Sequence, residues 1–258
     1  QTVKTADNQQ ISHRLPQEYM VDDHTGIQNP LGMTGVRLVT NVHIVTADVT
    51  ALHNVVTSCN RAQLGVAEIV LESVASSLSV LNKDEMELGV ALIDIGGGTT
   101  DLAIFCNGTI KHTWELALGG NNLTSDLSVG LRTPLQEAEE LKYLYGGSLA
   151  SMIKENHIIE VPTVGDRKPR KVSQRVMVEI LEARMEEILQ MVNKNISASG
   201  YRNRINAGTG HTGGTALLAN IVEMAEQVFD LPVRIGYPQG VAGRIEDIRS
   251  PRCTTGVG

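Results

Sequence analysis

Residues 92–105 read LIDIGGGTTDLAIF, an apolar segment interrupted by two aspartates, three glycines and two threonines. Glycine has no β-carbon, so the N–H groups of consecutive glycines can approach a phosphate closely. Asp94 ends the apolar run before the glycines, where a carboxylate suits a hydrated Mg²⁺ ion or an attacking water molecule. The stretch therefore predicts a phosphate loop between two strands, with a glycine-rich hairpin turn as the alternative. The loop consists of Gly96, Gly97, Gly98 and Thr99.

The loop does not match two common phosphate-binding patterns. It lacks the G-K-[ST] of a Walker loop, and the G-x-G-x-x-G fingerprint of dinucleotide-binding folds is absent. An apolar strand, and not a helix, follows the glycines at residues 100–105. The pattern therefore favours a phosphate loop that is part of a β-hairpin.

The composition is that of a globular protein. The chain has 258 residues, of which 41% are hydrophobic, and this is enough to bury a core in one or two domains. The net charge of −7 and the aromatic content of 3% argue against a nucleic acid as partner. The three cysteines lie far apart, without metal-ligand spacing, and indicate a reducing compartment. No signal peptide is expected, and the sequence holds no run of 18 apolar residues.

Hydrophobic periodicity predicts alternating strands and helices. Strands are expected at 36–49, 66–71, 90–95, 100–105, 109–118 and 233–236, with a further short strand near 19–21. Helices are expected at 51–64, 75–81, from the glycine pair 119–120 to 131, 134–145, 172–196 and 213–229. The stretch Thr133-Pro134-Leu135-Gln136 predicts a capping box with proline at the first helical position. This alternation predicts an α/β fold with an antiparallel hairpin inside a mixed sheet.

Two further glycine pairs lie where an apolar strand gives way to a helix, a position that attracts oxygen ligands. These two sites are Gly119, Gly120, Asn121 and Gly213, Gly214, Thr215. Between them, Glu139 and Lys142 are three residues apart on one helix face. This spacing fits either a solvated ion pair or a pair of ligand contacts.

The order of these segments resembles that of the actin-like ATPase superfamily. DIGGGTTD (94–101) looks like its second phosphate motif and HTGGTALL (211–218) like its adenosine motif. LESVASSLSVL (71–81) and CTTGVG (253–258) look like its two connecting motifs. Longer stretches are similar to the FtsA family of bacterial cell-division proteins, and this similarity covers nearly the whole chain. They are LPQEYMVDDHTGIQNPLGMTGVRL (15–38), GGNNLTSDLSVGLRTPLQEAEELKYLYG (119–146) and VPTVGDRKPRKVSQ (161–174).

The resemblance implies a ribonuclease H-like α/β fold with two lobes around a nucleotide cleft, the first lobe being incomplete. Residues 1–35 would belong to the family-specific small subdomain of lobe one, and 36–84 to its partial core. Residues 85–142 and 203–252 would form the nucleotide-binding core of lobe two, 143–202 its small, partner-binding subdomain, and 253–258 the start of the return to lobe one. The chain is expected to be a fragment without the family's N-terminal strand hairpin and C-terminal membrane helix.

The resemblance also implies residue roles, with ATP and Mg²⁺ as cofactors. Residues 96–99 would hold the β- and γ-phosphates, and Asp94 would face Mg²⁺ or the attacking water. Residues 119–121 would approach the ribose, Glu139 and Lys142 would contact ribose and adenine, and residues 213–215 would contact the adenosine from the other side. Glu72 stands where relatives keep a water-positioning carboxylate, or it is an ordinary glutamate at the end of a strand.

One departure from the family pattern concerns the strand before Gly213. Thr209, Gly210 and His211 stand where aliphatic residues are expected, and glycine and histidine fit a central strand poorly. This casts doubt on the adenosine site, and His211 is expected to be a misfit or a capped residue and not a ligand.

The implied function is an ATP-binding adaptor that polymerises and, with other divisome proteins, links filaments of the tubulin-like protein FtsZ to the cytoplasmic membrane at the septum. The protein would be cytoplasmic and would reach the membrane through a C-terminal helix absent from this chain. ATP hydrolysis would at most be slow. The alternative is a phosphotransferase or phosphohydrolase of the same fold, of the sugar kinase or exopolyphosphatase type.

The C-terminal tail of FtsZ is expected to bind the subdomain formed by residues 143–202. Basic residues gather there in an otherwise acidic protein, and an acidic tail peptide would suit them. A solvated loop and helix face is the alternative. The predicted contacts are Arg170, Lys171 and Arg184, and the cluster also includes Arg167, Lys168 and Arg175.

Overall fold

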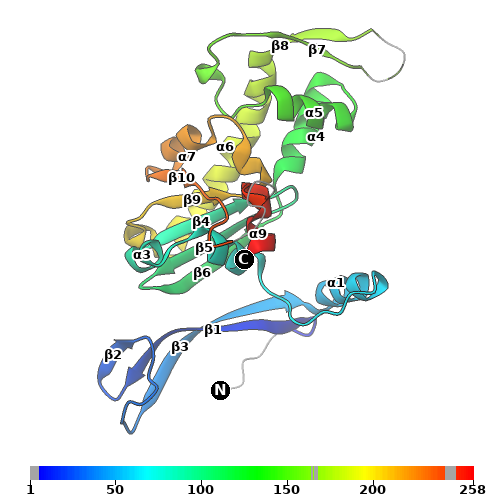
Figure 1. The fold of residues 1–258 in the computed structure, drawn as a ribbon. Helices are drawn as coiled ribbons and strands as arrows, with labels where there is room; N and C mark the ends of the chain where they lie inside the picture. The colour runs from blue at the N-terminus through cyan, green and yellow to red at the C-terminus, as the bar shows by residue number, and fades with distance from the viewer. Residues whose placement is uncertain (1–5, 164, 166–167, 242–247) are drawn as a thin grey trace.

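The structure is a computed structural model that describes residues 6–163, 165, 168–241 and 248–258 (Figure 1). The strands are β1 Gln9–Val21, β2 His24–Ile27, β3 Leu38–Asp48, β4 Val90–Ile95, β5 Thr100–Cys106, β6 Thr109–Leu116, β7 Ile158–Val161, β8 Arg170–Ser173, β9 Thr209–Thr212 and β10 Val233–Ile235. The helices are α1 Val49–Arg61, α2 Glu72–Val80, α3 Lys83–Leu88, α4 Gly120–Leu131, α5 Leu135–Tyr145, α6 Gln174–Ala198, α7 Ile221–Phe229 and α9 Thr254–Val257.

The central sheet has the strand order β10-β9-β4-β5-β6. β4 and β5 are antiparallel and form the hairpin around the glycine loop, whereas β9 runs parallel to β4. Asn107 and Gly108 both have positive φ angles, 53° and 69°, as a type I′ turn between β5 and β6 requires. The predicted antiparallel hairpin inside a mixed sheet is therefore confirmed.

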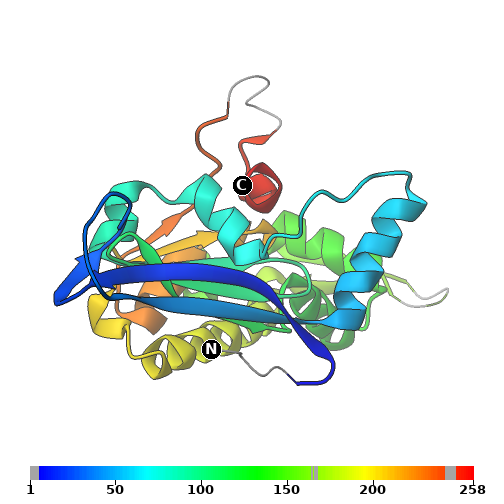
Figure 2. The ribbon, with the colours of Figure 1, turned by 90° about the horizontal axis from the view of Figure 1, so that it is seen from below.

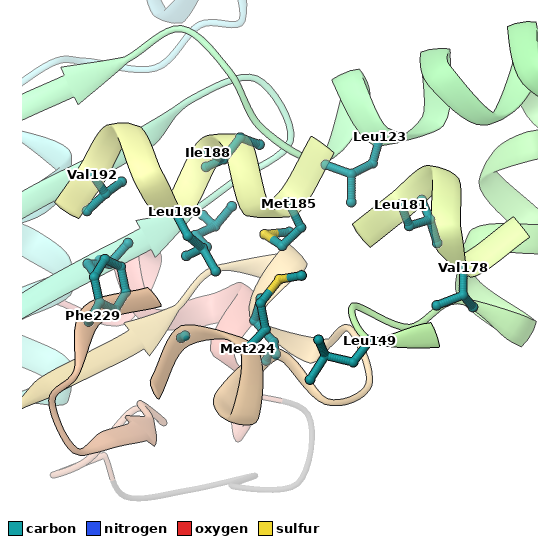
Figure 3. Close-up of a cluster of buried hydrophobic side chains, with 14 of the residues drawn as sticks. Leu123, Leu149, Val178, Leu181, Met185, Ile188, Leu189, Val192, Met224 and Phe229 are labelled. Atoms are coloured by element: carbon teal, nitrogen blue, oxygen red, sulfur yellow. The ribbon is translucent and has the colours of Figure 1, made fainter. Parts of the chain in front are cut away.

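The sheet separates two hydrophobic clusters. Alternate residues of β4 point to opposite faces, so that Ile93 packs in the larger cluster with α4, α6 and α7, and Leu92 in the smaller one with Val80 of α2. Figure 3 shows Met185, Ile188 and Leu189 of α6 within the larger cluster. Six residues spaced along one face of α6 are all buried, as the amphipathic pattern of this helix requires. They are Met177, Leu181, Met185, Ile188, Val192 and Ile196.

The three-stranded sheet β2-β1-β3 lies below the central sheet in the view of Figure 1 and crosses it in Figure 2. The predicted short strand near residues 19–21 is wrong in length, because β1 begins at Gln9 and pairs with β3 along its whole length. Polar residues and Pro16 hid it from the sequence pattern. The side-chain amide of Gln17 donates to the carbonyl oxygen of Ile110 at 2.9 Å and so joins β1 to β6.

Residues 66–71 do not form the predicted strand. A strand needs a neighbouring strand for its backbone groups, and no described strand pairs with this segment. Its last residue, Leu71, instead donates its backbone N–H to Nε2 of His13 at 3.3 Å. The segment has no regular secondary structure, and Glu72 begins helix α2 and does not end a strand. Helix α1 lies beside this segment and, in the described structure, has no buried residue.

Two helix starts also differ from the prediction. Thr133 does not cap α5, because its hydroxyl is buried without a hydrogen-bond partner in the described structure. The N-cap residue is Pro134, whose side chain has no polar atom that could accept a hydrogen bond from the first turn. The predicted helix over 213–229 is divided into a 3₁₀ turn, Gly214–Leu217, and helix α7. Asn220, with a φ of 62°, breaks the helical path between them.

Helices α4 and α5 and the hairpin β7-β8 extend beyond one end of the central sheet (Figure 1). None of the described helices is both long and apolar enough to span a membrane. The subdomain boundaries expected from the resemblance stay a prediction.

Candidate functional site

A cavity of about 800 Å³ lies where the glycine loop, α4, α5 and the turn after β9 meet. Seven of the predicted ligand-contacting residues line it: Gly97, Gly120, Asn121, Glu139, Lys142, Gly214 and Thr215. Residues that are far apart in the sequence are thus brought together around one space. Its lining also includes Tyr143, Leu217, Leu218 and Arg252, which the sequence pattern did not single out.

Backbone hydrogen bonds tie the glycine loop to the second glycine site. The N–H of Gly120 donates to the carbonyl oxygen of Gly96 at 2.9 Å, and the N–H of Asn121 donates to that of Gly97 at 2.7 Å. The hydroxyl of Thr215, from the third glycine site, also donates to Gly96 at 2.9 Å. A β-carbon at Gly120 would lie 2.5 Å from this hydroxyl oxygen, so the close approach requires glycine.

Lys142 and Glu139 form an ion pair of 2.6 Å at the cavity wall. The ammonium group of Lys142 also donates to the hydroxyl of Thr124 at 2.7 Å and to the carbonyl oxygen of Gly120 at 3.0 Å. Thr124 in turn donates to Glu139. Burial opposes ionisation of Glu139, but the hydrogen bonds from Lys142 and Thr124 outweigh it and lower the pKa of that carboxyl group. No pattern in the sequence points to Thr124, which lies on helix α4.

Asp94 and Glu72 lie apart from the lining of this cavity, on the α2 side of the sheet. Asp94 is buried and accepts hydrogen bonds from Ser76 at 2.6 Å and from Thr255 at 3.2 Å. Burial raises the pKa of Asp94, and these two hydrogen bonds oppose the rise. The hydroxyl of Thr255 also lies 3.5 Å from a carboxylate oxygen of Glu72. Burial and the nearby charge of Asp94 raise the pKa of Glu72.

A row of carboxylates crosses the hairpin at this point. Asp94 faces Asp101 across β4 and β5, and Asp101 faces Glu115 across β5 and β6, so that the three side chains share one face of the sheet. Asp101 is buried, and burial together with the charges of Glu72 and Glu115 raises its pKa to about 7. No group of three histidine, cysteine or acidic residues in the described structure could hold a metal ion directly.

The strand with the unexpected residues, β9, is an interior strand of the sheet. All four residues of β9 are buried. The backbone of β9 pairs with β4 on one side and with β10 on the other. Both ring nitrogens of His211 lack a hydrogen-bond partner within the described chain, and its ring lies 5.6 Å from that of Phe229. Gly213 follows with a φ of 86°, and a β-carbon there would collide with Asp94 and the backbone of Ile95. The strand is therefore formed in spite of its sequence.

The predicted basic contacts differ in how far their charges are compensated. Arg184 pairs with Asp126 at 2.6 Å and with Glu187. Arg170 donates to the carbonyl oxygen of Leu131 at the end of α4, while Lys171 is exposed on β8. Lys168 and Arg175 are exposed as well, and Arg167 lies outside the described residues.

Solved structures of known proteins share this fold. The MreB5 protein of Spiroplasma citri, bound to ADP, superimposes with a TM-score of 0.60 at 23% identity, covering 81% of this chain and 63% of that one. A type IV pilus biogenesis complex, PilM-PilN, gives a TM-score of 0.68 at 14% identity and covers 98% of this chain and 66% of that chain. The fold is therefore that of the actin-like ATPases, as predicted.

Two family models match the sequence. The model for cell division protein FtsA matches residues 91–258, and the model for the SHS2 domain inserted in FtsA matches residues 1–46. The chain belongs to the FtsA family of cell division proteins. It is 45% identical to the cell division protein FtsA of Pseudomonas aeruginosa over 258 residues, which is all of this chain and 62% of that protein.

Proposed function

We propose that this chain forms the ATP-binding part of an actin-like cell-division protein. The observation that carries the proposal is the 800 Å³ cavity with the glycine loop on one side and the Glu139–Lys142 pair on the other. Backbone N–H groups of a glycine loop suit phosphates, and polar side chains beside an apolar wall suit a nucleoside. The similarity of fold to a structure with bound ADP supports a nucleotide as ligand.

Mg²⁺, when bound with ATP, would supply positive charge that offsets the developing charge on the phosphates. Asp94 fits a contact through water, because its two hydroxyl donors, Ser76 and Thr255, hold one carboxylate oxygen and orient the group. Glu72 lies close enough to Thr255 to position a water molecule on the same side of the sheet. The protein is therefore proposed to be at most a slow ATPase.

Replacing Gly97 by valine together with Thr99 by alanine is expected to weaken ATP binding at least about a hundredfold. The branched side chain takes space at the phosphate loop, and the loss of two or three hydrogen bonds to a charged group accounts for this size of effect. A β-carbon at Gly97 would lie 3.4 Å from Oδ1 of Asn121, so the fold is expected to tolerate it. Isothermal titration calorimetry measures the affinity, and circular dichroism measures the fold.

The matched control replaces Gly65 by valine and Thr57 by alanine. Gly65 has no neighbour within 4 Å of its β-carbon position and lies far from the cavity in the chain. The control is expected to bind ATP as the parent does. Parent-like affinity of the Gly97/Thr99 variant would show that the loop does not bind phosphate.

We further propose that the protein polymerises and links FtsZ filaments to the cytoplasmic membrane at the septum. Membership of a family of cell division proteins supports this role. The C-terminal tail of FtsZ would bind residues 143–202, with other divisome proteins on the remaining surface. Membrane attachment would be made by a C-terminal amphipathic helix.

Replacing Lys171 by glutamate is expected to weaken binding of an FtsZ tail peptide several-fold at low salt and less at high salt. Lys171 is the most suitable position, because its charge is exposed whereas Arg184 is already paired with two carboxylates. Reversing a charge opposite an acidic peptide costs affinity, and salt screens that effect. Fluorescence anisotropy of the labelled peptide at two salt concentrations measures it.

Lys83→Glu on α3 makes the same charge change at an exposed position outside residues 143–202 and serves as control. If the Lys171 and Lys83 variants bind the peptide equally well at both salt concentrations, the basic cluster is not the docking surface.

A further inference from the structure

The two cationic side chains that line the cavity, Lys142 and Arg252, differ in how many of their N–H donors already have partners. The ammonium group of Lys142 has three partners, Glu139, Thr124 and Gly120, and these use all three of its N–H donors. Arg252 is exposed, and within the described part of the chain its guanidinium group makes no ion pair and no hydrogen bond. Arg252 is thus the cavity cation that has donors to spare for a ligand.

The guanidinium group of Arg252 lies over the ring of Tyr143, 5.4 Å from its centroid. Tyr143 is in the last turn of α5, and Arg252 is in the 3₁₀ turn Pro251–Cys253 before α9. On its way the arginine side chain passes Gly214, where a β-carbon would lie 3.5 Å from Cγ of Arg252. The pair therefore connects two elements across the rim of the cavity.

A bound ligand could replace the ring of Tyr143 in this contact with Arg252. The ring of Tyr143 belongs to a residue that is 71% exposed, so water reaches it and the pair gains little from burial. A guanidinium group is planar and weakly hydrated, and it stacks on any aromatic face that is offered. A nucleotide base in the cavity would offer such a face at the same rim.

We propose that Arg252 is a specificity-determining residue of the nucleotide site, whose guanidinium plane stacks on the base of bound ATP in place of the ring of Tyr143. This inference rests on the proposed function. A purine presents a larger face than a pyrimidine, so this stacking favours ATP over CTP. The triphosphate itself is bound by the glycine loop and does not depend on Arg252.

The test compares three probes on the 258-residue chain and its variants by isothermal titration calorimetry: ATP, CTP and inorganic tripolyphosphate. Arg252→Ala is expected to raise the Kd for ATP about tenfold, as the loss of a stacked cation does, and to leave the Kd for tripolyphosphate within twofold. Arg252→Lys keeps the charge without the plane and is expected to restore less than half of the loss. Arg61→Ala, an exposed arginine on α1, is the matched control.

The outcomes separate this inference from the proposed function. If the parent binds ATP and Arg252→Ala binds it equally well, the inference is overturned and the nucleotide site stands. If Arg252→Ala weakens ATP and tripolyphosphate alike, or Arg252→Lys binds ATP as the parent does, the residue acts through its charge and the stacking proposal is wrong. A parent that binds neither ATP nor tripolyphosphate overturns the proposed function and this inference with it.

Discussion

Replacing His211 by leucine is expected to make the protein markedly more resistant to acid. The ring is fully buried, and burial lowers its pKa to about 3, whereas a histidine in the unfolded chain titrates near 6.5. Above pH 6.5 both states hold the neutral ring and pH has no effect through this group. As the pH falls from 6.5 towards 3, only the unfolded state takes up the proton, and the free energy of unfolding decreases by about 1.4 kcal/mol per pH unit.

Between pH 7.5 and pH 4.5 the parent is therefore expected to lose about 3 kcal/mol through His211, and the His211→Leu variant is not. Removing two unpartnered buried nitrogens adds a stabilisation of about 1–3 kcal/mol at every pH. Urea denaturation of both proteins at the two pH values measures the difference, in which the titration of other groups cancels. His53→Leu is the control, because His53 is exposed on α1. A difference between parent and variant that does not change with pH would refute the prediction.

Replacing Asp101 by asparagine is expected to stabilise the protein at neutral and alkaline pH. The pKa of Asp101 is raised from 3.8 to about 7 by burial and by the charges of Glu72, Glu115 and Asp94. The stabilisation by the protonated carboxyl group is complete below pH 3.8 and is lost as the pH rises towards 7, because the unfolded state ionises first. This loss amounts to about 4 kcal/mol.

The Asp101→Asn variant cannot ionise, so it is expected to gain about 4 kcal/mol over the parent at pH 8 and to equal it near pH 4. The same urea denaturation series measures this gain. Asp23→Asn changes an exposed aspartate after β1 and is expected to leave the pH profile of the parent in place. A constant offset between Asp101→Asn and the parent from pH 4 to pH 8 would mean that Asp101 is ionised throughout.

The elements predicted best from the sequence are those whose pattern is complete within one segment. The periodic face of α6 and the apolar strands around Gly96–Gly98 are of this kind, since burial of one helix face or of a whole strand appears directly in the residue order. Most of β1 was missed for the opposite reason: its extent is determined by pairing with β3 and not by its own polar sequence. Residues 66–71 have the composition of a strand, but none of the described strands pairs with them.

The sequence pattern pointed to the glycines of the candidate site but not to the side chains that form its hydrogen bonds. Glycine pairs are visible in the sequence because few other residues allow such close backbone contacts. Thr124, Ser76 and Thr255 have no such signature. Each acts on a charged group from a different helix, and only the folded chain brings the partners together. The same holds for Arg252 and Tyr143, which are far apart in sequence and meet at the rim of the cavity.

The cavity is assembled from segments that begin at the glycine loop and end at Arg252. During synthesis the loop leaves the ribosome long before Arg252 does, so a growing chain has the phosphate loop without the wall that faces it. Contacts between such distant segments form late in folding, because the loops between them are long. A ligand that needs the complete cavity would bind the fully folded protein and stabilise it by mass action. The cellular supply of nucleotide would then act on the last stage of the protein's maturation, and incompletely folded chains would gain nothing from it.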